Sequence, residues 1–133
     1  MFTTIHMTVA AWCLVVAALL PIVSAGIAKS GGSAGQKRYD NGQPRAWLQQ
    51  QQGWRARANA AQSNGFESLP LFIGAVLFAQ QSGASQETVD LLSMAYIAIR
   101  GVYLAVYLAD LPTVRSLVFS AGLLVNLAIF FVA

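Results

Sequence analysis

The stretch RARANAAQSNGFESLPLFI, residues 55–73, decides how the rest of this chain is organised. It begins with two arginines, passes through Asn64 and Glu67, and continues directly into the apolar residues 69–79. Polar and ionisable side chains at membrane depth are costly, so they usually face the interior of a helical bundle or a wet cavity and mark a functional site. A carboxylate placed at the start of an apolar helix therefore needs a partner.

One face of this helix combines a cation, an amide and a carboxylate. At about 100° per residue, a single stripe contains Arg57, Ala60, Asn64, Glu67 and Leu71. Arg55 lies on the opposite side. Two interpretations stay open: the stripe forms a binding site, or Glu67 only pairs with an arginine of a neighbouring helix and serves packing.

The composition indicates a single-domain, all-α integral membrane protein. The chain has 133 residues, of which 56% are hydrophobic and 10% charged, and its mean hydropathy is +0.57. The apolar residues occur in blocks that approach the roughly 20 residues of a spanning helix. The single cysteine, Cys13, allows no internal disulfide and is interpreted as a packing thiol.

Four helices are predicted, at about residues 4–28, 50–81, 87–109 and 113–133, and together they form a membrane four-helix bundle. Pro21 and Pro70 should bend the first and second of these helices. Residues 29–53 form a polar connection, with a Gly/Ser-rich portion at 30–35 and turn-forming residues that include Asp40 and Pro44.

The distribution of basic residues sets the expected orientation. Six of the eight lysines and arginines lie between the first and second apolar blocks: Lys29, Lys37, Arg38, Arg45, Arg55 and Arg57. By the positive-inside rule this connection faces the cytoplasm, and both termini lie on the outer side. Topology therefore explains the net charge of +3 better than nucleic-acid binding does.

A second polar stripe lies on the third helix, where Arg100, Tyr103 and Tyr107 share one face with Asp110. Arg115 opens the fourth helix, where the field of the helix N-terminus favours an anion. The topology thus gathers one layer of polar residues near the cytoplasmic surface: Arg57, Asn64, Glu67, Arg100, Tyr103, Tyr107 and Arg115. Arginines around a carboxylate and two phenols suit an anionic peptide, because guanidinium groups hold carboxylates bidentately.

Purely structural interpretations, without a bound ligand, are also open for these residues. Tyr103 and Tyr107 are also compatible with an interfacial aromatic belt, and Arg100 with simple neutralisation of Glu67. Asn126, the one strongly polar interior residue of the fourth helix, is interpreted as a hydrogen-bonding link between helices. The sequence has no Cys/His cluster, Ser/His/Asp set or Gly-rich phosphate loop, which argues against a metal centre, an acyl-transfer triad or nucleotide hydrolysis.

The ordered motifs resemble those of the MAPEG group, the membrane-associated proteins of eicosanoid and glutathione metabolism, and specifically its small bacterial members. The resemblance covers nearly the whole chain. It is carried by Asp40, Asn41, Pro44 and Arg45 in a DN-x-x-PR turn, by Asn64 and Glu67 followed by LPLF, and by Arg100, Tyr103 and Tyr107 with Arg115 further on.

This resemblance implies a homotrimer in the bacterial inner membrane, with glutathione bound between adjacent subunits at the cytoplasmic side. Asn64, Glu67, Arg100, Tyr103 and Tyr107 would hold glutathione, with Arg57 as a further candidate contact, and Arg115 would stabilise its thiolate. The implied activity is a glutathione-dependent transferase or peroxidase acting on lipophilic electrophiles or hydroperoxides.

Two positions depart from the family pattern. Many members carry an arginine four residues before the asparagine and often a histidine two residues before it, where this chain has Ala60 and Gln62. Arg57, one turn earlier on the same stripe, is the candidate replacement. The alternative function, from another class, is non-catalytic binding or small-molecule transport with Glu67 and Arg100 as a ligand-coupled pair.

Overall fold

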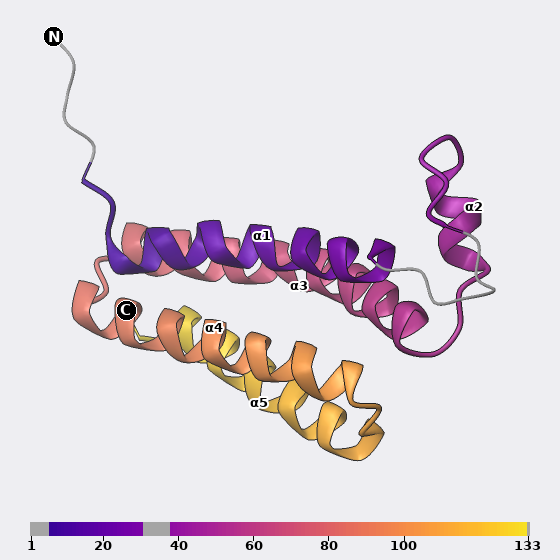
Figure 1. Ribbon diagram of the computed structural model, residues 1–133. Helices are drawn as coiled ribbons and strands as arrows, with labels where there is room; N and C mark the ends of the chain where they lie inside the picture. The colour runs from indigo at the N-terminus through magenta and orange to yellow at the C-terminus, as the bar shows by residue number, and fades with distance from the viewer. Residues whose placement is uncertain (1–5, 31–37, 133) are drawn as a thin grey trace, which may run out of the picture.

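The computed structural model describes residues 6–30 and 38–132, which contain five helices and no strand (Figure 1). The helices are α1 (Val9–Lys29), α2 (Pro44–Gln49), α3 (Trp54–Gln81), α4 (Gln86–Leu108) and α5 (Pro112–Phe130). The all-α prediction is confirmed for this part of the chain. Most of the predicted Gly/Ser-rich portion falls within residues 31–37, outside the described residues.

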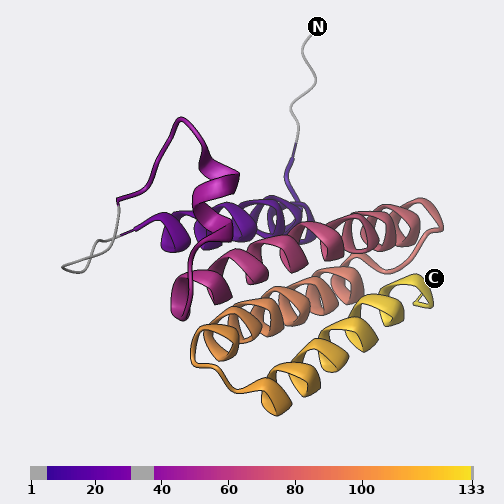
Figure 2. The same cartoon turned by 90° about the vertical axis from the view of Figure 1, so that its right-hand side faces the viewer.

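The four long helices lie alongside one another, and α2 stands at one end of them (Figures 1 and 2). Helices α3 and α4 each contact the other three long helices, so they form the centre of the molecule. Helix α1 begins and α5 ends at the same end of the molecule, whereas α2 and the α4–α5 turn lie at the opposite end (Figure 1). The residues of the predicted polar layer belong to the first half of α3, the second half of α4 and the start of α5, which lie toward the α2 end.

Two predicted helix starts were wrong. Residues 6–8 are not helical, and α1 begins at Val9 because the side chain of Thr8 caps it by accepting a hydrogen bond from the Ala11 N–H. The second long helix begins at Trp54 and not at 50, because Gly53 adopts a left-handed conformation (φ 67°) that ends the preceding segment. Pro44, interpreted as a turn residue, opens the short helix α2.

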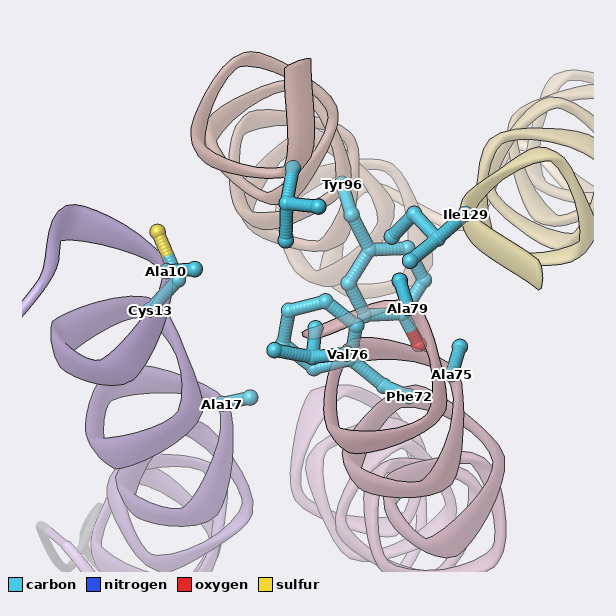
Figure 3. Close-up of a cluster of buried hydrophobic side chains, with 10 residues drawn as sticks. Ala10, Cys13, Ala17, Phe72, Ala75, Val76, Ala79, Tyr96 and Ile129 are labelled. Atoms are coloured by element: carbon cyan, nitrogen blue, oxygen red, sulfur yellow. The ribbon is translucent and has the colours of Figure 1, made fainter. Parts of the chain in front are cut away.

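Apolar side chains from all four long helices meet in one core (Figure 3). The ring of Phe72 on α3 stacks on that of Tyr96 on α4, with 4.3 Å between centroids. Val76 and Ile129 are fully buried beside them. The facing surface of α1 consists of small side chains, which let its backbone approach α3 closely: Ala10, Cys13 and Ala17.

Helix α1 is held by polar contacts near both ends. The Asp90 carboxylate of α4 accepts a hydrogen bond of 2.9 Å from the Ala10 N–H, which satisfies a donor that the first helical turn leaves free. At the other end, Arg55 of α3 donates from Nε and Nη2 to the Ser30 carbonyl, at 3.3 and 3.2 Å. Arg55 is only 3% exposed, so its position opposite the polar stripe serves the α1–α3 contact.

Three helices of the described chain are long and apolar enough to cross a membrane: α1, α4 and α5. Their outward surfaces carry large exposed apolar side chains, such as Trp12, Leu117 and Leu124. Exposed apolar area of this extent marks a membrane or subunit surface. Helix α3 is absent from this set because its first half contains the polar stretch that begins at Arg55.

Gly65 sets the distance between α1 and α3. A Cβ atom at this position would lie 2.7 Å from Cγ of Pro21, inside van der Waals contact. The proline ring cannot rotate away, because it is part of the α1 backbone. Gly65 therefore allows Pro21 to pack directly against α3, one residue from Asn64.

We expect Gly65→Ala to lower the free energy of unfolding by about 1–3 kcal/mol, because the added methyl group overpacks the α1–α3 contact. Gly74→Ala is the matched control, since no atom lies within 4 Å of a Cβ there and alanine is favoured over glycine in a helix by about 1 kcal/mol. Thermal unfolding in one detergent measures both. Equal midpoints for the two variants would contradict this view of Gly65.

Candidate functional site

Helices α3 and α4 are joined by a hydrogen bond between two predicted site residues. Arg100 Nη2 donates to Asn64 Oδ1 at 2.9 Å. Ser68, one turn after Asn64, donates from Oγ to the Asn64 carbonyl at 2.8 Å and approaches Oδ1 at 3.4 Å. The amide oxygen of Asn64 is thereby fixed as the acceptor for a cation.

Two arginine–tyrosine contacts continue from this hydrogen bond. The Arg100 guanidinium lies 4.3 Å from the centroid of the Tyr103 ring, and the Arg115 guanidinium lies 4.4 Å from that of Tyr107. The two rings meet edge to face, with centroids 5.6 Å apart. Such cation–π contacts hold a guanidinium in place and leave donors free at its edge.

These residues border two adjoining hollows between α3, α4 and α5. The first, the inter-helix cavity, has a volume of about 200 Å³ and is lined by Asn64, Glu67, Ser68, Leu71, Tyr96, Arg100, Val118, Phe119, Gly122, Leu123 and Asn126. The second, the Arg115 pocket, has a volume of about 240 Å³ and is lined by Asn64, Tyr103, Arg115, Ser116, Phe119 and Ser120. Asn64 and Phe119 line both hollows, so one ligand can contact both.

Glu67 is exposed and lines the inter-helix cavity. It makes no hydrogen bond or ion pair with the residues that the structure describes, because Arg100 donates to Asn64 instead. Neutralisation of Glu67 by Arg100 is therefore not observed. The carboxylate remains available to a cationic group of a ligand or of a second chain.

Arg57 does not lie with the other predicted site residues. Its Nε donates to the Leu108 carbonyl at 3.2 Å, and its Nη1 lies 3.9 Å from Asp110 Oδ2. A cation at the last carbonyls of a helix is favoured by the helix dipole. Arg57 thus ties the start of α3 to the end of α4, and its grouping with Asn64 and Glu67 is not observed in the single chain.

The interpretation of Tyr103 as a residue of an interfacial aromatic belt differs from the structure. Tyr103 is 5% exposed and contacts Arg100, Tyr107 and Phe119, the last with 6.1 Å between ring centroids.

Sequence reasoning did not identify Phe119 or Ser68 as cavity residues, because an isolated phenylalanine or serine on an apolar helix carries no specific signal. Within the described residues, no group of three His, Cys, Asp or Glu side chains is placed to hold a metal ion.

The fold and the site define an integral membrane protein with an arginine–tyrosine site between its helices. The model of the MAPEG family matches residues 9–133, and the chain belongs to this family. It is therefore a membrane protein of the glutathione and eicosanoid metabolism type. No curated protein and no solved structure matches the chain.

We expect Asn64→Leu to destabilise the protein by about 1–3 kcal/mol, because the half-buried Arg100 loses its only hydrogen-bond acceptor in the described chain. Asn64→Asp keeps an oxygen at this position and should unfold close to the native midpoint. Ser68→Ala, which removes only the supporting hydroxyl, should cost less than Asn64→Leu. Thermal unfolding of the three variants checks this order, and a native-like Asn64→Leu would contradict it.

Proposed function

We propose that the protein is a glutathione-dependent membrane transferase or peroxidase that acts on lipophilic electrophiles or hydroperoxides. The observation that carries this proposal is the pair of guanidinium groups, Arg100 and Arg115, fixed over tyrosine rings beside a cavity with apolar walls. Glutathione supplies two carboxylates, one ammonium group and one thiol. The site offers groups complementary to each of them.

In this proposal Arg100 and Arg115 attract the anionic groups of glutathione, and the free carboxylate of Glu67 accepts its ammonium group. Asn64 fixes Arg100 by a hydrogen bond. The ring of Tyr103 holds the guanidinium group of Arg100, and the ring of Tyr107 holds that of Arg115. The thiolate forms a new bond from sulfur to the electrophilic carbon, and the leaving group departs with its electron pair. Arg115 lowers the free energy of the negative sulfur before the attack.

We further propose that the four long helices span the membrane and that three copies assemble, so that each site is completed by a neighbouring copy. In support, Glu67 lies exposed between exposed apolar neighbours, Phe66 at 45% and Leu71 at 37%. A carboxylate in such surroundings requires cover by a polar partner.

The proposed orientation places the site at the cytoplasmic side of a bacterial inner membrane. Lys29 is the last residue of α1 and Arg45 belongs to α2, so both lie toward the end of the molecule at which α2 stands, as the site does. Basic residues flanking spanning helices are retained on the cytoplasmic side. The start of α1 and the end of α5 then face the periplasm.

Calorimetric titration of the detergent-solubilised protein with glutathione should show saturable binding, and Glu67→Gln should weaken it about tenfold, because the ammonium group loses its charged partner. Arg57→Ala is the matched control, since Arg57 contacts the end of α4 and not the cavity. The absence of saturable heat from the native protein would overturn the assignment of glutathione.

Arg115→Ala should reduce the rate of glutathione conjugation to a chlorinated aromatic about tenfold or more at neutral pH, because each unit of thiol pKa corresponds to about 1.4 kcal/mol. The variant's pH–rate profile should move toward higher pH, since the bound thiol then ionises later. Arg115→Lys, which keeps the charge but not the planar stacking on Tyr107, should retain an intermediate rate. Full activity of Arg115→Ala would remove Arg115 from the mechanism.

A further inference from the structure

The inter-helix cavity ends at a buried amide that nothing in the described chain satisfies. Asn126 of α5 is 2% exposed, it lines the cavity, and its Oδ1 has no hydrogen-bond partner. It lies three turns along α5 from Arg115, toward the end of the molecule that is remote from α2. The cavity thus has one end beside Arg100 and Asn64, and another end at Asn126.

The side-chain amide of Asn126 does not link α5 to another described helix by a hydrogen bond. The sequence predicts that Asn126 hydrogen-bonds another helix, but no such bond forms within the described residues. Its 2% exposure also keeps it from the outer surface, where a second copy would pack. An unsatisfied buried amide costs about 1–3 kcal/mol, so its partner is expected inside the cavity itself.

The rest of the cavity wall limits the size and the chemistry of the molecule that can hydrogen-bond Asn126. Between Asn126 and the polar end, the lining is mostly apolar, with Leu71 from α3 and Val118 and Leu123 from α5, and Tyr96 of α4 contributes a buried phenol ring. A volume of about 200 Å³ accommodates one substituted ring, since a dry cavity of about 150 Å³ binds benzene. A charged molecule would meet no counter-charge at the Asn126 end, whereas a neutral hydroxyl group would meet the amide.

We propose that the inter-helix cavity binds a compact lipophilic molecule whose hydroxyl group donates a hydrogen bond to Asn126 Oδ1. The catalytic role of this site rests on the proposed function. In that function, the co-substrate places its hydroxyl group at Asn126 and its reacting group toward Arg100 and the Arg115 pocket. The preferred electrophiles are then lipophilic molecules with a neutral hydrogen-bond donor remote from the reacting atom.

The test compares two probes of nearly equal shape, 2-phenyl-2-propanol and tert-butylbenzene, in which a hydroxyl group replaces a methyl group. Equilibrium dialysis in one detergent, without glutathione, gives the dissociation constant of each probe for each protein. The native protein should prefer the alcohol about fivefold, the value of one neutral hydrogen bond. Asn126→Leu should abolish this preference and still bind the hydrocarbon.

Asn59→Leu is the matched control, because it makes the same substitution on α3 outside the cavity and should keep the fivefold preference. If Asn126→Leu does not fold, Asn126→Ala removes the same amide without adding bulk in its place. Equal binding of both probes by the native protein, or a preference that survives in the Asn126 variants, overturns the proposal. Native protein that binds neither probe also overturns the proposal.

The two proposals fail separately. Probe binding is measured without glutathione, so a lost alcohol preference with intact glutathione heat overturns only the hydroxyl site. An intact, Asn126-dependent preference in a protein that gives no heat with glutathione overturns the proposed activity and leaves the hydroxyl site in place.

Discussion

The hydrogen bond between Arg100 and Asn64 is the interaction on which the site depends. Within apolar helices, a guanidinium group and an amide each need a partner, and here they satisfy one another across α3 and α4 at 2.9 Å. The choice of a neutral acceptor has an electrostatic consequence. Because no carboxylate neutralises Arg100 in the described chain, its positive charge remains available to an anion, and Glu67 remains free for a cation.

The same turn of α3 also governs the packing of the fold. Asn64 points to α4, and the adjacent Gly65 receives Pro21 of α1, so two neighbouring residues fix α3 against helices on two sides. Asp90 and Arg55 hold the two ends of α1 from α4 and α3 respectively. Polar contacts at helix ends and close packing in the middle therefore position the site, and the Phe72–Tyr96 stack fills the core beyond it.

Helical periodicity predicted much of the grouping of these side chains, because residues on one stripe of one helix stay together whatever the tertiary structure does. Arg100, Tyr103 and Tyr107 form connected contacts as their spacing implied. Periodicity failed for Arg57, because it identifies a face but not the position of neighbours along the axis. Arg57 lies about 10 Å before Asn64 on the helix, where the last carbonyls of α4 are within reach of its side chain.

Short and irregular features could not be predicted from the sequence. Helix α2 has six residues, too few for a periodic pattern, and is defined by Pro44 at its start and Gly53 after it. Asn126 was recognisable as polar, but only the tertiary structure shows that no helix supplies its partner. Hydropathy indicated the spans of α1, α4 and α5. The helix that carries Asn64 and Glu67 was predicted as well, but its start was placed at residue 50 and not at Trp54.

The departures at Ala60 and Gln62 bear on how the site is completed. Ala60 supplies no cation, so in the described chain the guanidinium groups that border the two hollows are those of Arg100 and Arg115. On another face of α3, Gln62 lines a separate hollow of about 270 Å³ together with Arg45 and Asn59, and its Oε1 is buried without a partner in the described chain. One chain thus carries two unlike polar surfaces. A ring of identical copies brings unlike surfaces together at each interface, so two unlike polar surfaces on one chain are compatible with the proposed trimer.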